Sequence, residues 1–200
     1  MVMLYNISPS PTLGLGEHEF VTWNDGFTEV EINTVIEVGD SLEKEHSQID
    51  NGKLSPKNVR ISEIAWMYPT QENMWLYNRL SWILRQLNAQ FYRFNITGFD
   101  EPFQYTIYKG SNDDGGHYCW HKDTGGDAPR KLSIVMQLSD PSEYEGGDLE
   151  LLNGNGDILK VEKKKGFIAM FPSYHPHRVT PVTSGIRRSL VVWASGPAFV

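Results

Sequence analysis

The pattern that most constrains the fold is a series of short β-rich segments in the second half of the chain. Turn-forming sequences separate these segments, such as Gly146-Gly147 and the Asn- and Gly-rich stretch 153–157. Strands at this regular spacing, without intervening helices, predict an antiparallel sandwich or barrel. The predicted strands cover residues 104–108, 131–138, 148–152, 158–161, 167–171, 178–182 and 187–194.

The first hundred residues carry helix signals instead. Thr28-Glu29-Val30-Glu31 has the Thr-x-x-Glu form of a capping box and predicts the start of a helix. A second helix is predicted over about residues 71–90, where apolar residues recur at helical spacing, and 61–67 is a candidate strand. We therefore predict an α+β fold in one domain over residues 1–200. A mainly helical layer (1–100) would pack on the outer face of a β core (101–200).

Composition narrows the class of partner and the compartment. The formal net charge of −7 argues against general nucleic-acid binding, which needs clustered lysines and arginines. No apolar stretch reaches the ~18 residues of a membrane span, and Met1–Leu15 lacks the features of a secretory signal. The single cysteine, Cys119, cannot form an internal disulfide, which favours a reducing compartment. The expectation is a soluble, cytoplasmic protein that binds neither nucleic acid nor membrane, with Cys119 as a small buried hydrophobe.

The first candidate for chemistry is the pair His121 and Asp123, separated by Lys122. In an extended segment, residues i and i+2 point to the same face, so an imidazole and a carboxylate can reach one metal ion. A motif this short is weak by itself and needs structural context.

The second candidate lies downstream, where His177 is followed ten residues later by Arg187. A further imidazole completes a set of two histidines and one carboxylate, which leaves positions open on iron(II) for a 2-oxo acid and dioxygen. Arg187 can hold the far carboxylate of a diacid bidentately. Strand alternation favours it over Arg188, because Arg187 shares a face with Trp193. The ten-residue interval likewise favours His177 over His175, which we place near the site or at the surface.

Together these residues resemble the catalytic core of the prolyl-hydroxylase-like branch of the iron(II)/2-oxoglutarate oxygenases. The resemblance covers residues 104–197, nearly half the chain, and rests on the order and spacing of several phrases. They are Tyr108, Tyr118-x-x-His121-x-Asp123, Leu132-Ser133, Tyr144-x-Gly146-Gly147-Asp148-Leu149, Gly166-x-x-x-x-Phe171-Pro172-Ser173 and His177-x-Val179-x-Pro181-Val182-Thr183-x-Gly185-x-Arg187, followed by Trp193. One departure is the segment Ser111–Gly116, which lengthens the loop between the two tyrosines.

Membership would imply a double-stranded β-helix, or jelly-roll, with helices on its outer face. It would also imply hydroxylation of an unactivated C–H bond, coupled to conversion of 2-oxoglutarate to succinate and CO₂. The resemblance makes His121, Asp123 and His177 ligands of Fe(II) and Arg187 the anchor of 2-oxoglutarate. By the same resemblance, Tyr108 contacts that cosubstrate, whereas Tyr118 and Trp193 line the substrate pocket, with core packing as the alternative for each.

The substrate is less determined than the chemistry. Similarity to prolyl hydroxylases favours a peptidyl residue such as proline, with a free amino acid or another small molecule as the alternative. A metal-binding jelly-roll without turnover, or a cupin-like isomerase or hydrolase, is a further possibility, although neither would need Arg187. The acidic and Gly-rich loops Ser111–Gly116 and Thr124–Pro129 flank the metal-ligand candidates, and we expect them to be mobile and to order around substrate.

Overall fold

The described part of the chain contains two α-helices and two facing β-sheets. The computed structural model describes residues 18–46, 48–49, 53–54, 56–124 and 129–198. The signal-peptide expectation for Met1–Leu15 therefore falls outside the described residues, as does most of the predicted loop Thr124–Pro129.

The larger sheet is antiparallel and contains eight strands. In spatial order they are β1 (Val21–Trp23), β13 (Ile168–Pro172), β9 (Arg130–Gln137), β15 (Val182–Ser195), β7 (Phe103–Lys109), β6 (Glu63–Met67) and β2 (Glu45–His46). The eighth strand, β10 (Tyr144–Gly146), pairs with the start of β15.

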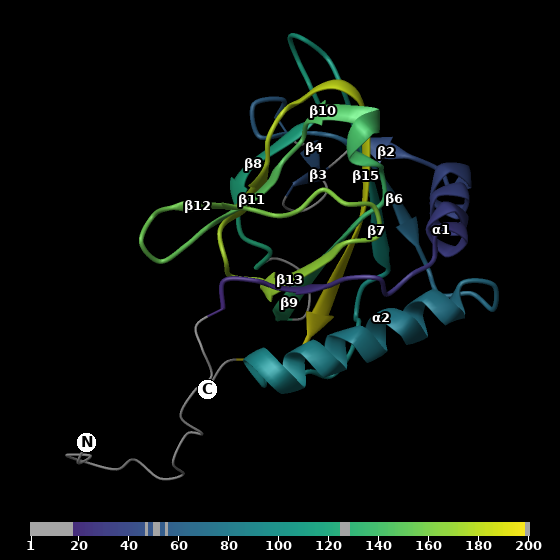
Figure 1. Ribbon diagram of the computed structural model, residues 1–200, viewed down its shortest axis with the longest axis vertical. Helices are drawn as coiled ribbons and strands as arrows, with labels where there is room; N and C mark the ends of the chain where they lie inside the picture. Colours follow the sequence, from purple (N-terminus) through teal and green to yellow (C-terminus); the bar gives the residue numbers. More distant parts are fainter. Residues whose placement is uncertain (1–17, 47, 50–52, 55, 125–128, 199–200) are drawn as a thin grey trace.

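The smaller sheet is also antiparallel and supplies the other wall of the jelly-roll. Its order is β12 (Ile158–Lys160), β11 (Leu149–Leu152), β14 (His177–Val179), β8 (His117–His121) and β5 (Arg60–Ile61). A separate hairpin joins β3 (Gln48–Ile49) to β4 (Lys53–Leu54). In Figure 1, β8, β11 and β12 lie on the left, opposite the helices.

Both helices cover the outer face of the larger sheet (Figure 1). Helix α1 (Glu29–Ser41) begins with the predicted capping box: Thr28 Oγ1 accepts from the Glu31 backbone N–H, and the Glu31 carboxylate accepts from the Thr28 N–H. Helix α2 (Met74–Leu87) continues into a π-helical turn, Asn88–Tyr92. Among the described residues, neither helix combines the length and apolarity needed to cross a membrane.

The helices and the sheet enclose an outer core. Helix α2 is amphipathic, and its buried residues recur at three- and four-residue intervals, which places them on one face toward the sheet. They are Leu76, Leu80, Ile83, Leu84 and Leu87. They join Tyr105, Ile134 and Leu190 of the sheet in one apolar cluster, whereas a second cluster fills the space between the two sheets.

The two predicted helices are present, but the described part of residues 1–100 also contains strands that the sequence analysis did not predict. Six strands, β1–β6, lie among the described residues of this part, and four of them, β1, β2, β5 and β6, extend the two sheets. The backbone groups at the sheet edges explain this, because they need partners: β6 pairs with β7, β1 with β13 and β5 with β8. Most of these strands have two or three residues, too few for an alternating pattern, and only the longer β6 matches a predicted strand.

The predicted β core is confirmed, and its longest strand has the expected alternation. Along β15, Leu190 and Val192 are buried in the outer core, whereas Arg187, Ser189 and Trp193 are buried on the inner side. Neighbouring residues of β15 thus take part in two different cores. Strands β8 and β10 carry no strand pattern of their own, so the predicted strands do not include them.

Candidate functional site

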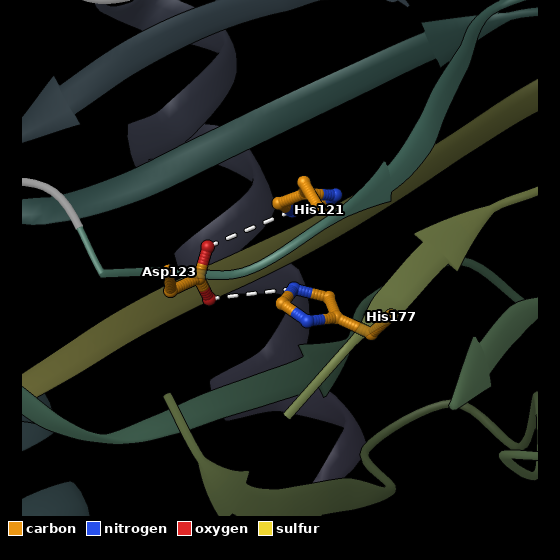
Figure 2. A group of neighbouring side chains, drawn as sticks. All are labelled: His121, Asp123 and His177. Carbon is orange, nitrogen blue, oxygen red and sulfur yellow. Dashed lines mark ion pairs between the residues drawn. The ribbon is translucent and has the colours of Figure 1, made fainter. Parts of the chain in front are cut away.

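Three residues predicted to bind metal meet at one point between the sheets (Figure 2). His121 ends β8 and is paired in register with His177, which begins β14. Asp123 follows β8, and its backbone N–H donates to the Ser173 carbonyl at 2.8 Å. The ligand atoms of the three side chains all lie within 4.8 Å of one another. The His121 Nε2–Asp123 Oδ1 distance is 3.6 Å, and the His177 Nε2–Asp123 Oδ2 distance is 3.4 Å.

Both imidazoles are oriented by the backbone two residues earlier. His121 Nδ1 lies 2.8 Å from the Cys119 carbonyl oxygen, and His177 Nδ1 lies 2.9 Å from the His175 carbonyl oxygen. A carbonyl can only accept, so each Nδ1 carries the proton in these contacts. The Nε2 atom of each ring is thereby turned toward Asp123, and it is the atom that would bind a metal ion.

The Asp123 carboxylate is buried and is held by a serine. Ser133 Oγ, on β9, donates to Asp123 Oδ2 at 2.7 Å and lies 3.0 Å from Ser173 Oγ. The Trp193 indole also lies close enough to favour the charged carboxylate, although its N–H makes no hydrogen bond of normal geometry. These contacts fix the carboxylate beside both imidazoles.

The charges of the three groups suit a cation. Burial opposes ionisation of Asp123, but the charge of His177 and its hydrogen bond outweigh burial, so the pKa of this carboxyl lies far below its usual range. Burial, helped by the neighbouring His177, lowers the pKa of His121 to about 3. Burial also acts against charged His177, yet Asp123 overcomes it and raises the pKa of that imidazole. A divalent ion could replace the proton that Asp123 and His177 share, and two nitrogens with one carboxylate fit iron(II).

A second polar pocket surrounds Arg187, which is only 1% exposed. Its Nη2 donates to Gln137 Oε1 at 3.0 Å, its Nη1 contacts Ser189 Oγ at 3.4 Å, and its guanidinium carbon lies 5.3 Å from the Tyr108 ring centroid. Among the described residues, no carboxylate forms an ion pair with Arg187. This pocket therefore holds a buried cation without an anion of its own.

Several hydrogen-bonding atoms in this pocket lack partners. Arg187 Nε, Gln137 Nε2 and the hydroxyl of Tyr144, which lies beside Arg187, are buried without a hydrogen bond. Gly147 makes room here: its φ is +63°, and an added Cβ would lie 2.9 Å from Arg187 Cδ. Unpaired buried donors are costly, so the pocket is suited to a ligand that accepts them. A carboxylate is such a ligand.

The predicted substrate residues lie near the metal-ligand candidates. The Tyr118 ring stacks on His121, with centroids 3.4 Å apart and planes inclined by 15°. The guanidinium carbon of Arg130 lies 3.8 Å from the centroid of Trp193, which is largely buried. Both positions agree with a pocket role and with a packing role, so the assignment of Tyr118 and Trp193 to substrate remains a prediction.

Two residues near the ligands play parts other than binding. His175 uses its carbonyl to orient His177, and its own ring does not join the metal cluster. Cys119 is exposed, which corrects the expectation of a buried residue. Its thiol contacts the Asn58 carbonyl oxygen at 3.1 Å, because β8 turns this side chain toward the segment before β5.

Sequence reasoning missed five polar residues that line the site. Ser133 and Tyr144 stand in the phrases that carry the family resemblance, so that signal was present. The other three, Gln137, Arg60 and Gln104, stand in no such phrase. Strand alternation places Gln104 on the face of Tyr108 and Gln137 on the face of Ser133, but only the pairing of distant strands brings them to the two arginines.

Comparisons with known proteins agree with this geometry. Residues 103–195 match the family described as the 2OG-Fe(II) oxygenase superfamily. A PKHD-type hydroxylase of Sphingopyxis alaskensis is 31% identical over 146 residues, covering 68% of this chain and 63% of the relative. Another, from Synechococcus sp. strain CC9605, is 38% identical over 81 residues, covering 40% of this chain and 36% of the relative. The chain thus spans less than two thirds of the length of these relatives.

Solved structures share the fold at low sequence identity. A Trichoplax adhaerens prolyl hydroxylase, in complex with a peptide fragment of the oxygen degradation domain of hypoxia inducible factor, superposes with a TM-score of 0.74. Its identity is 19%, over 88% of this chain and 83% of that one. A Pseudomonas putida prolyl-4-hydroxylase gives a TM-score of 0.72 and 21% identity, over 91% and 95%. By sequence over residues 103–195 and by fold over most of its length, this chain is similar to members of the 2OG-Fe(II) oxygenase superfamily.

Proposed function

We propose that this chain is a dioxygenase that uses iron(II) and 2-oxoglutarate to hydroxylate an unactivated C–H bond. The observation that carries the proposal is the buried Arg187 pocket, with its unpartnered donors, inside the same β core as the His121–Asp123–His177 cluster. A module that only binds metal would have no use for a buried cation without an anion.

Each group has a distinct part in the proposed reaction. His121, Asp123 and His177 would hold the iron, and Ser133 would keep the carboxylate in place. Arg187 would bind the distal carboxylate of 2-oxoglutarate, with Gln137 and Tyr144 as further donors and Tyr108 beneath the guanidinium. When bound, the iron and cosubstrate would supply the activation of dioxygen, and the protein would supply their orientation in a largely buried site.

For the substrate, we propose a peptidyl residue, with proline as the leading candidate. The fold shared with prolyl hydroxylases and the names of the hydroxylase relatives support this choice. Trp193 and Tyr118 would present flat apolar surfaces to such a ring near the iron. A free amino acid or another small molecule is the alternative. Dioxygen is the remaining partner.

The test is an anaerobic titration with iron(II) and 2-oxoglutarate, followed by a succinate assay in air against peptide and small-molecule pools. His177→Ala should lose iron, whereas His175→Ala, two residues away on the same segment, should retain it. Loss of iron in His175→Ala with retention in His177→Ala would reverse the assignment. Failure of the wild type to bind 2-oxoglutarate would refute the proposed function.

We also propose a cytoplasmic location, which rests on the single cysteine. Fractionation of the native host tests this directly. Recovery of the protein from an oxidising compartment would contradict it.

A further inference from the structure

A second buried arginine lies beside the metal-ligand candidates. Arg60, on β5, is 7% exposed; its Nε donates to Ser62 Oγ at 2.8 Å, and its Nη2 donates to Gln104 Oε1 at 3.0 Å. Its guanidinium carbon lies 4.6 Å from the centroid of Tyr118, the ring that stacks on His121. In the described part of the chain, no carboxylate forms an ion pair with Arg60.

The setting of Arg60 repeats that of Arg187. Each guanidinium contacts the hydroxyl of the serine two residues later, Ser62 or Ser189. Each guanidinium also donates to the side-chain oxygen of a buried glutamine on the large sheet, Gln104 for Arg60 and Gln137 for Arg187. Each lies over a tyrosine ring, Tyr118 for Arg60 and Tyr108 for Arg187. Two separate arginines therefore have the same neutral surroundings.

The third arginine of this region shows that neutral partners are not the rule. Arg130, which lies over Trp193, forms a two-pronged ion pair with Glu101, with Nε donating to Oε1 at 2.6 Å and Nη2 to Oε2. The chain thus supplies a carboxylate to one arginine near the site and an amide to the other two. A buried guanidinium without an anion is costly, and a carboxylate is the partner that matches its geometry.

A count of charges leads to the same conclusion. With iron(II), ionised Asp123, dianionic 2-oxoglutarate and Arg187 in place, the charges cancel, and the Arg130–Glu101 pair is neutral in itself. Arg60 then adds one further positive charge beside this neutral set. One further carboxylate would neutralise it.

We propose that Arg60 and Gln104 form a receptor for a carboxylate of the primary substrate, so that the enzyme hydroxylates a carboxylic acid. This inference rests on the proposed function and names the substrate class. The carboxylate could be the free carboxyl end of an amino acid or peptide, or an acidic side chain next to the hydroxylated residue. Both sources present the same group to Arg60.

Matched acid and amide probes test the receptor on the anaerobic protein loaded with iron(II) and 2-oxoglutarate. Calorimetry would compare N-acetyl-L-proline with N-acetyl-L-prolinamide, and N-acetyl-Pro-Asp-amide with N-acetyl-Pro-Asn-amide. We expect at least one acid to bind about tenfold or more tightly than its amide, since charge-assisted bonds are the stronger class. Preference in the first pair indicates a free carboxyl end, and preference in the second indicates an acidic side chain. Equal affinities in both pairs, or no binding of either acid at millimolar concentration, would overturn the proposal.

The variant Gln104→Glu gives a second readout that needs no substrate. It places a carboxylate beside Arg60, and we expect the preference for acids to fall toward unity and the melting temperature of the ligand-free protein to rise by about 2–4 °C. The control is Arg130→Met, which removes a guanidinium that already has its carboxylate; the acid preference should survive it. If Gln104→Glu lowers the melting temperature and leaves the acid preference intact, Arg60 does not need a carboxylate partner, and the proposal is wrong. The titration of wild type with 2-oxoglutarate tests the proposed function separately, since Arg60 does not contact that pocket's residues.

Discussion

One face of the large sheet packs against α1 and α2, and the other face lines the candidate site. Along β15, Leu190 and Val192 enter an apolar core with the helices, while Arg187 and Ser189 enter the space between the sheets. Of the buried polar atoms without partners among the described residues, four belong to the inner side: Gln137 Nε2, Tyr144 OH, Arg187 Nε and Trp193 Nε1. The same strands thus carry a satisfied face and an unsatisfied one.

This difference indicates a division of labour within single strands. Apolar burial on the outer face supplies stability without regard to ligands. The inner face contains groups that lower stability until a ligand satisfies them, as is common at functional sites. Because side chains alternate, a slip of one residue in register would exchange the two faces, so the pairing of β15 with β7 and β9 matters for both.

The strongest test of the outer face is Leu80→Ala. Leu80 is 0% exposed in the helix–sheet core, so the truncation should lower the free energy of unfolding by about 3–5 kcal/mol. Chemical denaturation measures the loss. Iron and 2-oxoglutarate affinities of the folded protein should stay near wild type, and a large change in either would show that the two faces are not separable.

The matching test of the inner face compares neighbours on β15. Arg187→Ala should weaken 2-oxoglutarate binding by about 2–5 kcal/mol, the range for removing one partner of a buried charged pair, and should leave iron bound. Arg188 points outward and pairs with Asp40 of α1, so Arg188→Ala is the control and should leave cosubstrate affinity unchanged. Calorimetric titration of both variants with 2-oxoglutarate measures the two affinities. A larger effect in Arg188→Ala would mean that the assumed faces are reversed.

A smaller effect is expected for the residue that orients Asp123. Ser133→Ala removes the hydroxyl that donates to Asp123 Oδ2 and should weaken iron(II) binding about 10- to 100-fold, as loss of such supporting contacts does in other metal sites. Ser173→Ala is the control, because Ser173 contacts Ser133 rather than the carboxylate. Metal content after dialysis against graded chelator gives the affinities. Equal losses in both variants would point to general loosening of the core.

The smallest effect concerns the capping box of α1. A hydrogen bond from Arg79, followed by that from the Thr28 backbone, lowers the pKa of Glu31 below its ordinary value of 4.5. This stabilisation is therefore present above the ordinary pKa and is lost as pH falls through the lowered one. Glu31→Gln should cost no more than about 0.2–1 kcal/mol at neutral pH, because the pair is partly exposed. In a plot of the free energy of unfolding against pH, the variant should also show a shallower fall on the acid side. An unchanged fall would contradict the lowered pKa of Glu31.

The sequence was informative wherever local spacing determines position. Alternation placed Arg187 and Arg188 on opposite faces of β15, and the Thr-x-x-Glu pattern located the start of α1. The side chains of His121 and Asp123 also lie together as their two-residue separation predicts, although Asp123 lies just beyond the end of β8. These features depend on a few consecutive residues, which a sequence displays directly.

Features that depend on distant pairing were not visible. β5 has two residues and reaches the site only because it pairs with β8, which carries Arg60 to Tyr118. Gln104 and Gln137 reach Arg60 and Arg187 only because strands that are distant in the sequence pack together. β1 and β5 were missed for the same reason, since their partners, β13 and β8, come from far along the chain.

The backbone contacts of the two histidines have a consequence for sequence variation. Because the carbonyls of residues 119 and 175 orient the imidazoles, the side chains at those positions do not take part in holding the rings. A homologue could carry almost any residue there and keep the same ring orientation, provided that the chain stays extended. Cys119, whose exposed side chain lies two residues from His121, would here be a site for attaching a spectroscopic label close to the candidate metal site.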